Sequence, residues 1–207
     1  MMNDEDKDSI LYLCLQIIAM KRTFLAIPIP CGTEFPALTQ RLQRNLEHER
    51  RNINWCKPDQ IHLTLKFVGD TPDQDIPKII EACQQVAQRH QPFTMDFNRT
   101  GFFGSNHSPR VLWLGMKDEP KALYELEADV LDAFDSLGYL RDRQNFVPHL
   151  TVCRIKQLID KPFFQQICQG IEQKTYLHAD VREIVYLQSF LQPTGAFYKT
   201  LRRIPLG

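Results

Sequence analysis

The chain has 207 residues, of which 43% are hydrophobic and 24% are charged. This balance is typical of a soluble globular protein and argues against intrinsic disorder, and the length suits one domain or two small lobes that share a core. Lysine plus arginine equal aspartate plus glutamate at 25 each, so no overall basic field would gather nucleic acid, and any RNA contact must be local and short.

The cysteines and the N-terminal residues indicate the cellular compartment and where the domain begins. The six cysteines are scattered, without a C-x-x-C pair or Cys/His ligand spacing, so we expect free thiols in the cytoplasm and neither a disulfide framework nor a zinc site. An apolar run over residues 10–20 is too short to span a bilayer and lacks the flanks of a signal peptide. Because a strand-like segment follows Met20 directly, we predict an extension over residues 1–20, hypothetically from a mis-set translation start, and one domain over residues 21–207. Neutral charge and the lack of heptads favour a monomer that does not bind membranes.

Hydrophobic periodicity predicts strands and helices that are interspersed along the chain. We expect, in order, a strand at 22–29, a helix at 33–51, a strand at 61–68, a helix at 72–89, strands at 93–103 and 110–116, a helix at 121–137, a strand at 148–155, a helix at 162–171, and strands at 181–191 and 197–204. Gly69-Asp70 should close the second strand, and Thr71 should cap the helix that follows. Several strands are sequential and joined by hairpins, which favours an α+β fold with antiparallel or mixed sheets over a doubly wound parallel sheet.

The most informative feature is one local pattern that occurs twice, 87 residues apart. The first copy is Ile61-His62-Leu63-Thr64-Leu65 and the second is Pro148-His149-Leu150-Thr151-Val152. Residues i and i+2 of a strand share a face, so each copy should present one imidazole and one hydroxyl on the same surface while its other side chains face the core. Two such strands side by side would place two imidazoles and two hydroxyls in one cleft.

This set of groups suits displacement at phosphorus without a metal. A neutral imidazole can take a proton from attacking water, a protonated one can give a proton to the departing alkoxide, and threonine hydroxyls can bind non-bridging phosphoryl oxygens. A structural histidine is the simplest alternative for either motif alone. Metal binding is a further alternative, weakened because neither motif has another ligand at i+2 or i+4. The sequence contains no G-x-S-x-G elbow and no P-loop.

At these residues the sequence resembles the 2H phosphoesterase superfamily, whose hallmark is two H-x-T-x motifs. Within it the chain is most similar to the RNA 2′,3′-cyclic phosphodiesterase family, also called LigT-like or tRNA 2′–5′ ligase, which is associated with tRNA processing and RNA ligation. The similar segments cover nearly the whole chain from Lys21 onward. They are residues 22–27, 55–58 with 62–69, 109–115, 146–154, and 187–191 with 195–198.

The resemblance implies a bilobed α+β fold with two mostly antiparallel sheets, flanking helices and a central cleft. It implies a hydrolase that opens RNA 2′,3′-cyclic phosphate ends, or small cyclic nucleotides, to 2′-phosphomonoesters without a metal or cofactor, and that can also join RNA ends. His62 would be the acid and His149 the base, while Thr64 and Thr151 would hold the phosphate.

Arg154 could add positive charge to this cleft and bind substrate. At i+5 from His149, however, strand alternation predicts that it points to the opposite face unless the strand bends. Three alternatives stay open for the chain: action on 2′–5′ oligonucleotides, action on another small cyclic phosphate, and binding of RNA ends without catalysis.

Overall fold

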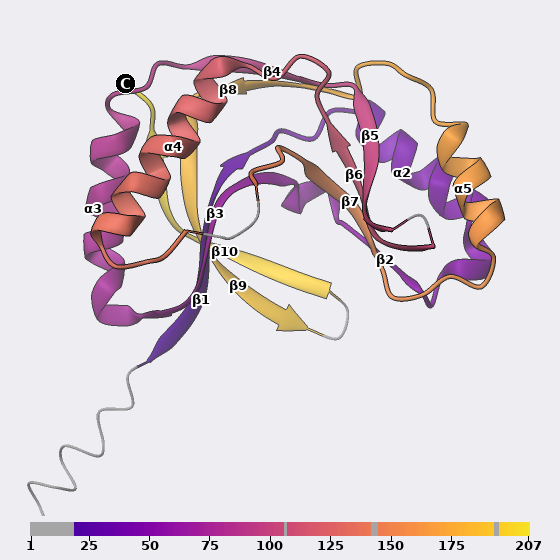
Figure 1. The fold of residues 1–207 in the computed structure, drawn as a ribbon, viewed down its shortest axis with the longest axis horizontal. Helices are drawn as coiled ribbons and strands as arrows, with labels where there is room; N and C mark the ends of the chain where they lie inside the picture. Colours follow the sequence, from indigo (N-terminus) through magenta and orange to yellow (C-terminus); the bar gives the residue numbers. More distant parts are fainter. Residues whose placement is uncertain (1–18, 106, 142–144, 193–194) are drawn as a thin grey trace, which may run out of the picture.

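The computed structural model describes residues 19–105, 107–141, 145–192 and 195–207, and they form two lobes side by side (Figure 1). All strand pairs are antiparallel, as expected for the predicted α+β class. The first lobe is built on a sheet of order β10-β9-β1-β3 and the second on a sheet of order β2-β7-β6-β5. Each sheet contains one of the two motifs.

The first lobe combines the beginning and the end of the chain. Its sheet consists of β1 (Met20–Pro28), β3 (His62–Pro72), β9 (Glu183–Gln192) and β10 (Gly195–Pro205). Helices α3 (Ile76–Ala87) and α4 (Lys121–Ser136) pack against each other and cover one face of this sheet. Fully buried side chains such as Leu25, Leu63 and Tyr186 fill the layer between sheet and helices. The other face of the sheet is therefore left for the site.

The second lobe is assembled from the middle of the chain. Its sheet consists of β2 (Ile53–Trp55), β5 (Arg99–Ser105), β6 (Ser108–Gly115) and β7 (Leu150–Ile155). Helices α2 (Glu34–Asn45) and α5 (Lys161–Gln169) lie on its outer side (Figure 1). A contact between Phe102 of β5 and Phe164 of α5, with ring centroids 5.7 Å apart, ties α5 to the back of the sheet. A two-stranded sheet of β4 (Phe93–Phe97) and β8 (Leu177–Val181) completes the fold.

Predicted and observed elements agree for all four predicted helices and differ at several boundaries. The first helix ends at Asn45 and a short 3-10 turn, η1 (Glu47–Glu49), follows it. Two further such turns are η2 (Pro58–Gln60) and η3 (Asp73–Asp75). The predicted strand 93–103 is two strands, and β4 pairs with β8 instead of with the motif sheet. Neither β2 nor β8 was predicted, because each is too short for its periodicity to stand out.

The predicted end of the second strand at Gly69-Asp70 and the predicted cap at Thr71 are both wrong. Strand β3 continues to Pro72, with Gly69 at a φ of +84°. The Thr71 side chain is buried and its hydroxyl lies 2.6 Å from that of Thr23, which in turn contacts the Tyr186 hydroxyl at 2.7 Å. This buried chain of hydroxyls uses Thr71 to join three strands, so it is not available to begin a helix.

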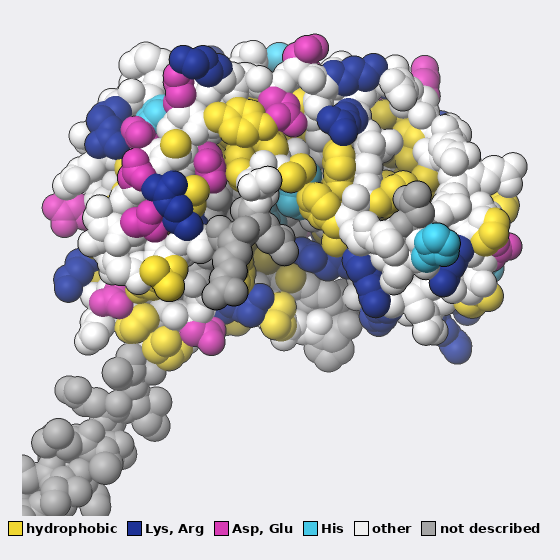
Figure 2. All heavy atoms as spheres, viewed as in Figure 1, with side chains coloured by type: hydrophobic (Ala, Val, Ile, Leu, Met, Phe, Trp, Pro, Cys, Tyr) yellow, Lys and Arg dark blue, Asp and Glu magenta, His cyan; other side chains and the backbone are white. Residues whose placement is uncertain are grey.

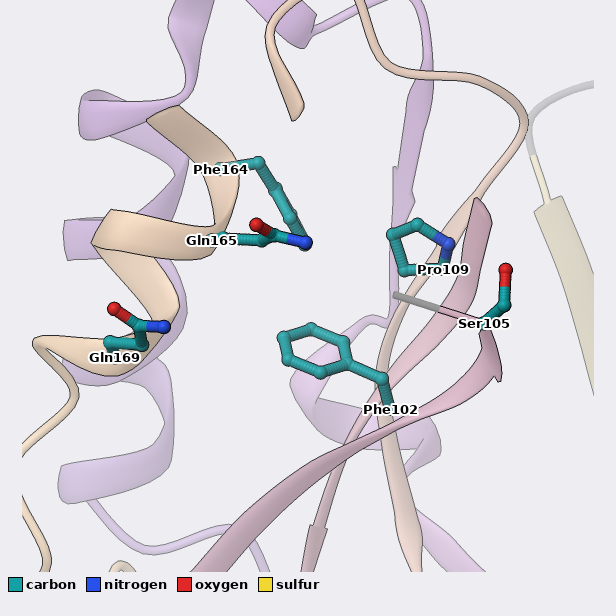
Figure 3. Close-up of a pocket in the computed structure, with 6 residues that line it drawn as sticks. All are labelled: Phe102, Ser105, Pro109, Phe164, Gln165 and Gln169. Atoms are coloured by element: carbon teal, nitrogen blue, oxygen red, sulfur yellow. The ribbon is translucent and has the colours of Figure 1, made fainter. Parts of the chain in front are cut away.

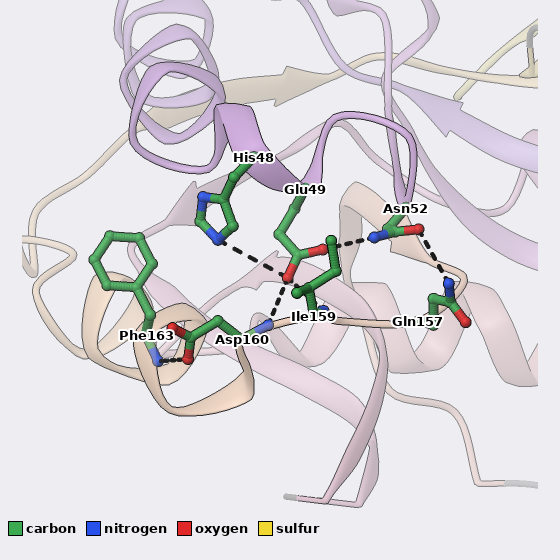
Figure 4. Close-up of polar contacts among 7 residues, drawn as sticks. All are labelled: His48, Glu49, Asn52, Gln157, Ile159, Asp160 and Phe163. Atoms are coloured by element: carbon green, nitrogen blue, oxygen red, sulfur yellow. Dashed lines mark hydrogen bonds and ion pairs between the residues drawn. The ribbon is translucent and has the colours of Figure 1, made fainter.

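A buried carboxylate anchors the loop that follows β7. The Glu49 side chain is fully buried and accepts hydrogen bonds from the backbone N–H groups of Ile159 and Asp160, at 2.6 and 2.9 Å, and from the Asn52 amide at 2.8 Å (Figure 4). Burial alone would raise the pKa of Glu49, but these hydrogen bonds together lower it below its usual range. Asp160 then caps α5 by accepting from the N–H of Phe163.

The N-terminal prediction falls almost wholly on residues 1–18, which lie outside the described residues; β1 begins at Met20. None of the helices in the described part is long and apolar enough to cross a membrane. The five cysteines described are free thiols, as predicted, and Cys153 is a buried strand residue.

Candidate active site

Both motif histidines are held in the same way by the backbone. His62 opens β3 and its Nδ1 lies 2.9 Å from the carbonyl oxygen of Gln60, while His149 directly precedes β7 and its Nδ1 lies 2.8 Å from the carbonyl oxygen of Val147. A carbonyl oxygen only accepts, so each Nδ1 must carry the proton and donate it. Nε2 of each imidazole is therefore the nitrogen that can take up or release a proton.

Each motif strand contains a β-bulge just after its threonine. Across β1 and β3, Ala26 pairs with Thr64 and Leu25 pairs with Lys66, so Leu65 is an extra residue. Across β6 and β7, Trp113 pairs with Thr151 and Leu112 with Cys153, so Val152 is the extra residue. In both strands two consecutive side chains are consequently buried, Leu65 with Lys66 and Val152 with Cys153. A bulge of this kind shifts the alternation of the residues that follow it by one, up to the next bulge, which in β3 lies at Val68.

The bulges correct the expectation for Arg154. Strict alternation would place this side chain on the face opposite to His149, but the extra residue Val152 returns it to the motif face, where it lines a pocket with His62 and Thr64. The Val152 carbonyl oxygen accepts a hydrogen bond of 2.9 Å from the N–H of Cys56, which helps to hold the bulge. In β3 the bulge acts in the same way on Phe67, which sequence reasoning had not singled out.

The pocket has a volume of about 330 Å³ and lies on the uncovered face of the first lobe. Its lining is basic, hydroxylic and aromatic, with no carboxylate: Arg22, Phe24, His62, Thr64, Phe67, Arg154, Ser189, Leu191, Ala196 and Tyr198. Seen from the side of Figure 1, Lys and Arg side chains gather around the lower hollow between the lobes (Figure 2). The site was expected to hold two phosphate-binding threonines. Of these, Thr64 lines the pocket, whereas Thr151 is half-buried on β7 and is not among its lining residues.

Aromatic rings fix the orientation of both imidazoles. The His62 ring meets Tyr198 edge-on, with centroids 4.9 Å apart and an interplanar angle of 87°, and also contacts Phe24 at 4.9 Å. The His149 ring meets Phe103 edge-on, at 4.7 Å and 89°. These edge-to-face contacts are geometrically specific, so they restrict ring rotation about both side chains.

A second layer of packing supports His149. The Phe103 ring lies 5.7 Å from that of Trp113, and Gly101 makes room for the indole, because a Cβ at this glycine would overlap the indole ring. The Arg99 guanidinium lies 5.8 Å from the centre of the same indole. His149 is thus positioned by packing that extends across β6 and β5.

The environment lowers the pKa of both imidazoles. For His62, burial is the largest cause; together with positive charge on Arg154 and His149, and against the hydrogen bond to Gln60, it lowers the pKa to about 4. Burial and Arg154 likewise lower the pKa of His149, against its bond to Val147. Arg154 is thus close enough to lower the pKa of both rings, and His149 is close enough to lower that of His62. These lowered pKa values favour the neutral form of both imidazoles at pH 7.

A second cavity of the described structure lacks titratable side chains in its lining. A cavity of about 170 Å³ lies between the β5–β6 hairpin and α5, lined by Phe102, Ser105, Pro109, Phe164, Gln165 and Gln169 (Figure 3). Phe102 points to the opposite face from Phe103, so this cavity is on the back of the motif sheet and it contains no titratable side chain. No cluster of three or more histidine, cysteine, aspartate or glutamate side chains that could hold a metal ion occurs within the described residues.

Comparison with known proteins shows the family to which the sequence belongs. Residues 40–189 match the 2′-5′ RNA ligase superfamily. Two proteins named RNA 2′,3′-cyclic phosphodiesterase are 34% identical (Archaeoglobus fulgidus, 72% of this chain and 82% of that protein) and 32% identical (Geobacillus stearothermophilus, 90% of this chain). The chain spans only 58% of the length of the Geobacillus protein.

Solved structures share the fold. The crystal structure of a Thermus thermophilus protein superposes with a TM-score of 0.72 at 23% identity, covering 89% of this chain and 97% of that one. Escherichia coli LigT in its apo form superposes with a TM-score of 0.69 at 21% identity, covering 91% and 98%. Because the family model matches residues 40–189 and these relatives are 32–34% identical, the chain belongs to the 2′-5′ RNA ligase superfamily and, within it, to the family of RNA 2′,3′-cyclic phosphodiesterases.

Proposed function

We propose that the protein hydrolyses RNA 2′,3′-cyclic phosphate ends to 2′-phosphomonoesters, with His62 and His149 as the acid–base pair. The observation that carries the proposal is the matched pair of imidazoles, each with Nδ1 bound to a backbone carbonyl and Nε2 left to exchange a proton. Thr64 and Arg154 share a pocket with one of them and supply donors for the phosphoryl oxygens.

The chemistry balances without a further reactant. One imidazole takes a proton from water through Nε2 as the water oxygen attacks phosphorus. The bond between phosphorus and the 3′ oxygen breaks, its electrons stay on that oxygen, and the second imidazole protonates it. The product keeps the phosphate on the 2′ oxygen and gains a free 3′ hydroxyl, and the two histidines end with their protonation states exchanged.

We assign the acid role to His62 and the base role to His149, and we assign Thr64, Thr151 and Arg154 to the phosphate. A neutral His149 suits a base. To act as the acid, His62 must first be protonated, and the surroundings of its imidazole disfavour this because they lower its pKa to about 4. The negative charge of the bound cyclic phosphate counteracts both burial and the repulsion from Arg154, so His62 should take up its proton together with substrate.

The direct test is to incubate the protein with an oligonucleotide that ends in a 2′,3′-cyclic phosphate and to identify the phosphomonoester against authentic 2′- and 3′-phosphate standards. We expect the 2′-phosphate, a bell-shaped pH profile and activity that persists in EDTA. A 3′-phosphate product would reverse the leaving group. His62→Gln and His149→Gln should each lower turnover by about 10²–10⁴-fold while the fold is kept, and full activity of either variant would remove that histidine from the mechanism.

The same acid–base pair could act on 2′–5′ linked oligonucleotides or other cyclic phosphates, and the reverse reaction would join a cyclic phosphate to a 5′-hydroxyl. Assays with a 2′–5′ dinucleotide and with two RNA fragments measure these activities separately. An RNA-end binder without catalysis would retain the cyclic phosphate unchanged in all of them.

We further propose that the protein is a cytoplasmic monomer. Its neutral net charge and its scattered free thiols support this setting. Light scattering on the purified full chain and fractionation of the source cells test the two statements.

A further inference from the structure

The pocket contains a second arginine that the proposed reaction does not use. Arg22 lies on β1, and its guanidinium carbon is 4.6 Å from the centre of the Phe67 ring. The side chain is exposed, and no carboxylate of the described residues forms an ion pair with it. One face of the guanidinium is therefore covered by an aromatic ring, while its N–H groups remain available to a ligand. Stacking of this kind orients the planar guanidinium before it binds.

The two arginines of the pocket lie at different places relative to the acid–base pair. Arg154 lowers the pKa of both histidines and also that of Tyr198, so it lies beside the reacting groups. Arg22 extends from β1, where its guanidinium stacks on Phe67, and it contributes with Arg154 to lowering the pKa of Tyr198, against the larger effect of burial, which raises it. Because Arg154 already serves the reacting phosphate, the second positive charge is available to another anionic group of the substrate.

The charges that line the two ends of the first lobe's cleft face differ. The site pocket at Arg22 and Arg154 has no carboxylate in its lining. Beyond His62, on the side away from this pocket, a groove contains three carboxylates and two arginines, and one carboxylate is paired with an arginine: Asp59, Asp180, Glu183, Arg182 and Arg203. A polyanionic strand that left the site through this groove would meet more carboxylates than cations, whereas a strand leaving past Arg22 would meet a cation.

A chain of RNA carries its next charge one nucleotide away from its reactive end. The terminal nucleoside is joined to its neighbour by a phosphodiester on its 5′ side, and a cavity of about 330 Å³ with the aromatic surface of Phe67 can take more than a phosphate group. We propose that Arg22, held against Phe67, binds this 5′-side phosphodiester, so that the site selects an RNA strand over a free nucleoside cyclic phosphate. The inference rests on the proposed function and adds a specificity residue to it.

The test compares two substrates, adenosine 2′,3′-cyclic phosphate and the dinucleotide ApA with the same cyclic end. The measured quantity is the ratio of kcat/KM for the dinucleotide to kcat/KM for the nucleoside, because any general damage to the site enters both values. In Arg22→Gln we expect this ratio to fall about tenfold through KM of the dinucleotide, and the slope of log KM against log salt concentration to decrease by about 0.7. Arg22→Lys should recover part of the ratio, since a lysine keeps the positive charge but lacks the planar guanidinium that stacks on Phe67.

Two further variants, one of them a control, test which lobe the RNA strand follows. Arg44→Gln removes an exposed arginine from the last turn of α2, outside the pocket, and should leave the ratio at the wild-type value. An unchanged ratio in Arg22→Gln would overturn the inference, as would a fall in the ratio produced by Arg99→Gln instead, which would put the strand on the second lobe. Failure of the wild-type protein to turn over either substrate would count against the proposed function itself, and is distinguishable from both results.

Discussion

Arg154 offers the sharpest test of how the site works, because its place depends on the β-bulge. Replacing it in Arg154→Gln removes a positive charge from beside two imidazoles. The fall in the pKa of His62 from 6.5 to about 4 corresponds to roughly 3 kcal/mol against the imidazolium form. Burial accounts for the larger part, so in Arg154→Gln the pKa of His62 should rise from about 4 yet stay below 6.5, and the pKa of His149 should rise as well.

Although the pKa values of the histidines rise in Arg154→Gln, its turnover should fall. Although protonation becomes easier, the phosphate loses a charged partner that is already in position. Losing one such donor typically costs about 10²–10³-fold in turnover. Arg154→Lys is the matched control. It keeps the charge, so the pKa values of His62 and His149 should remain near those of the wild type. Its turnover should still be reduced, because an ammonium cannot bind a phosphate in the bidentate manner of a guanidinium.

The assay is an NMR titration of the histidine Cε1–H signals in the ligand-free protein, followed by turnover of a cyclic phosphate oligonucleotide by the same samples. The protein has six histidines, and the two motif signals are assigned by their loss in His62→Gln and His149→Gln. An unchanged pKa of His62 in Arg154→Gln would refute the reasoning, because it would mean that the guanidinium does not face the imidazole. Undiminished turnover would separately remove Arg154 from phosphate binding.

Stability gives three further expectations, all measurable by urea unfolding. Gly101→Ala should lower the free energy of unfolding by about 1–3 kcal/mol and reduce activity, because its Cβ displaces Trp113. Gly32→Ala, with nothing near its Cβ, should lower neither stability nor activity. Equal losses of stability in the two variants would contradict the packing argument. Glu49→Gln should lose about 2–3 kcal/mol, since an amide cannot accept from all of the donors around it. Because the pKa of His62 is lower in the folded state, the free energy of unfolding should fall as pH decreases from 6.5 towards 4, and His62→Gln should weaken this dependence.

Local patterns were sufficient for much of the fold. The helices at 121–137 and 162–171 were predicted to within one or two residues, because their apolar positions recur at helical spacing and neighbouring residues decide that spacing. The two histidines and the pairing of each with a threonine also followed from local alternation. Short elements such as β2 and β8 did not, since three to five residues carry too little periodicity.

Contacts between distant segments decided the rest of the site. Alternation within one strand predicts that Arg154 faces away from His149, and only pairing with β6 reveals the extra residue Val152 that turns it back. Arg22 and Phe67 are 45 positions apart, and no local signal links them; antiparallel pairing of β1 with β3 brings them into contact. The sequence by itself thus determined which groups carry the chemistry, because side-chain type and strand period are local properties. The tertiary structure decided which charges surround them, since register and bulges depend on a partner strand elsewhere in the chain.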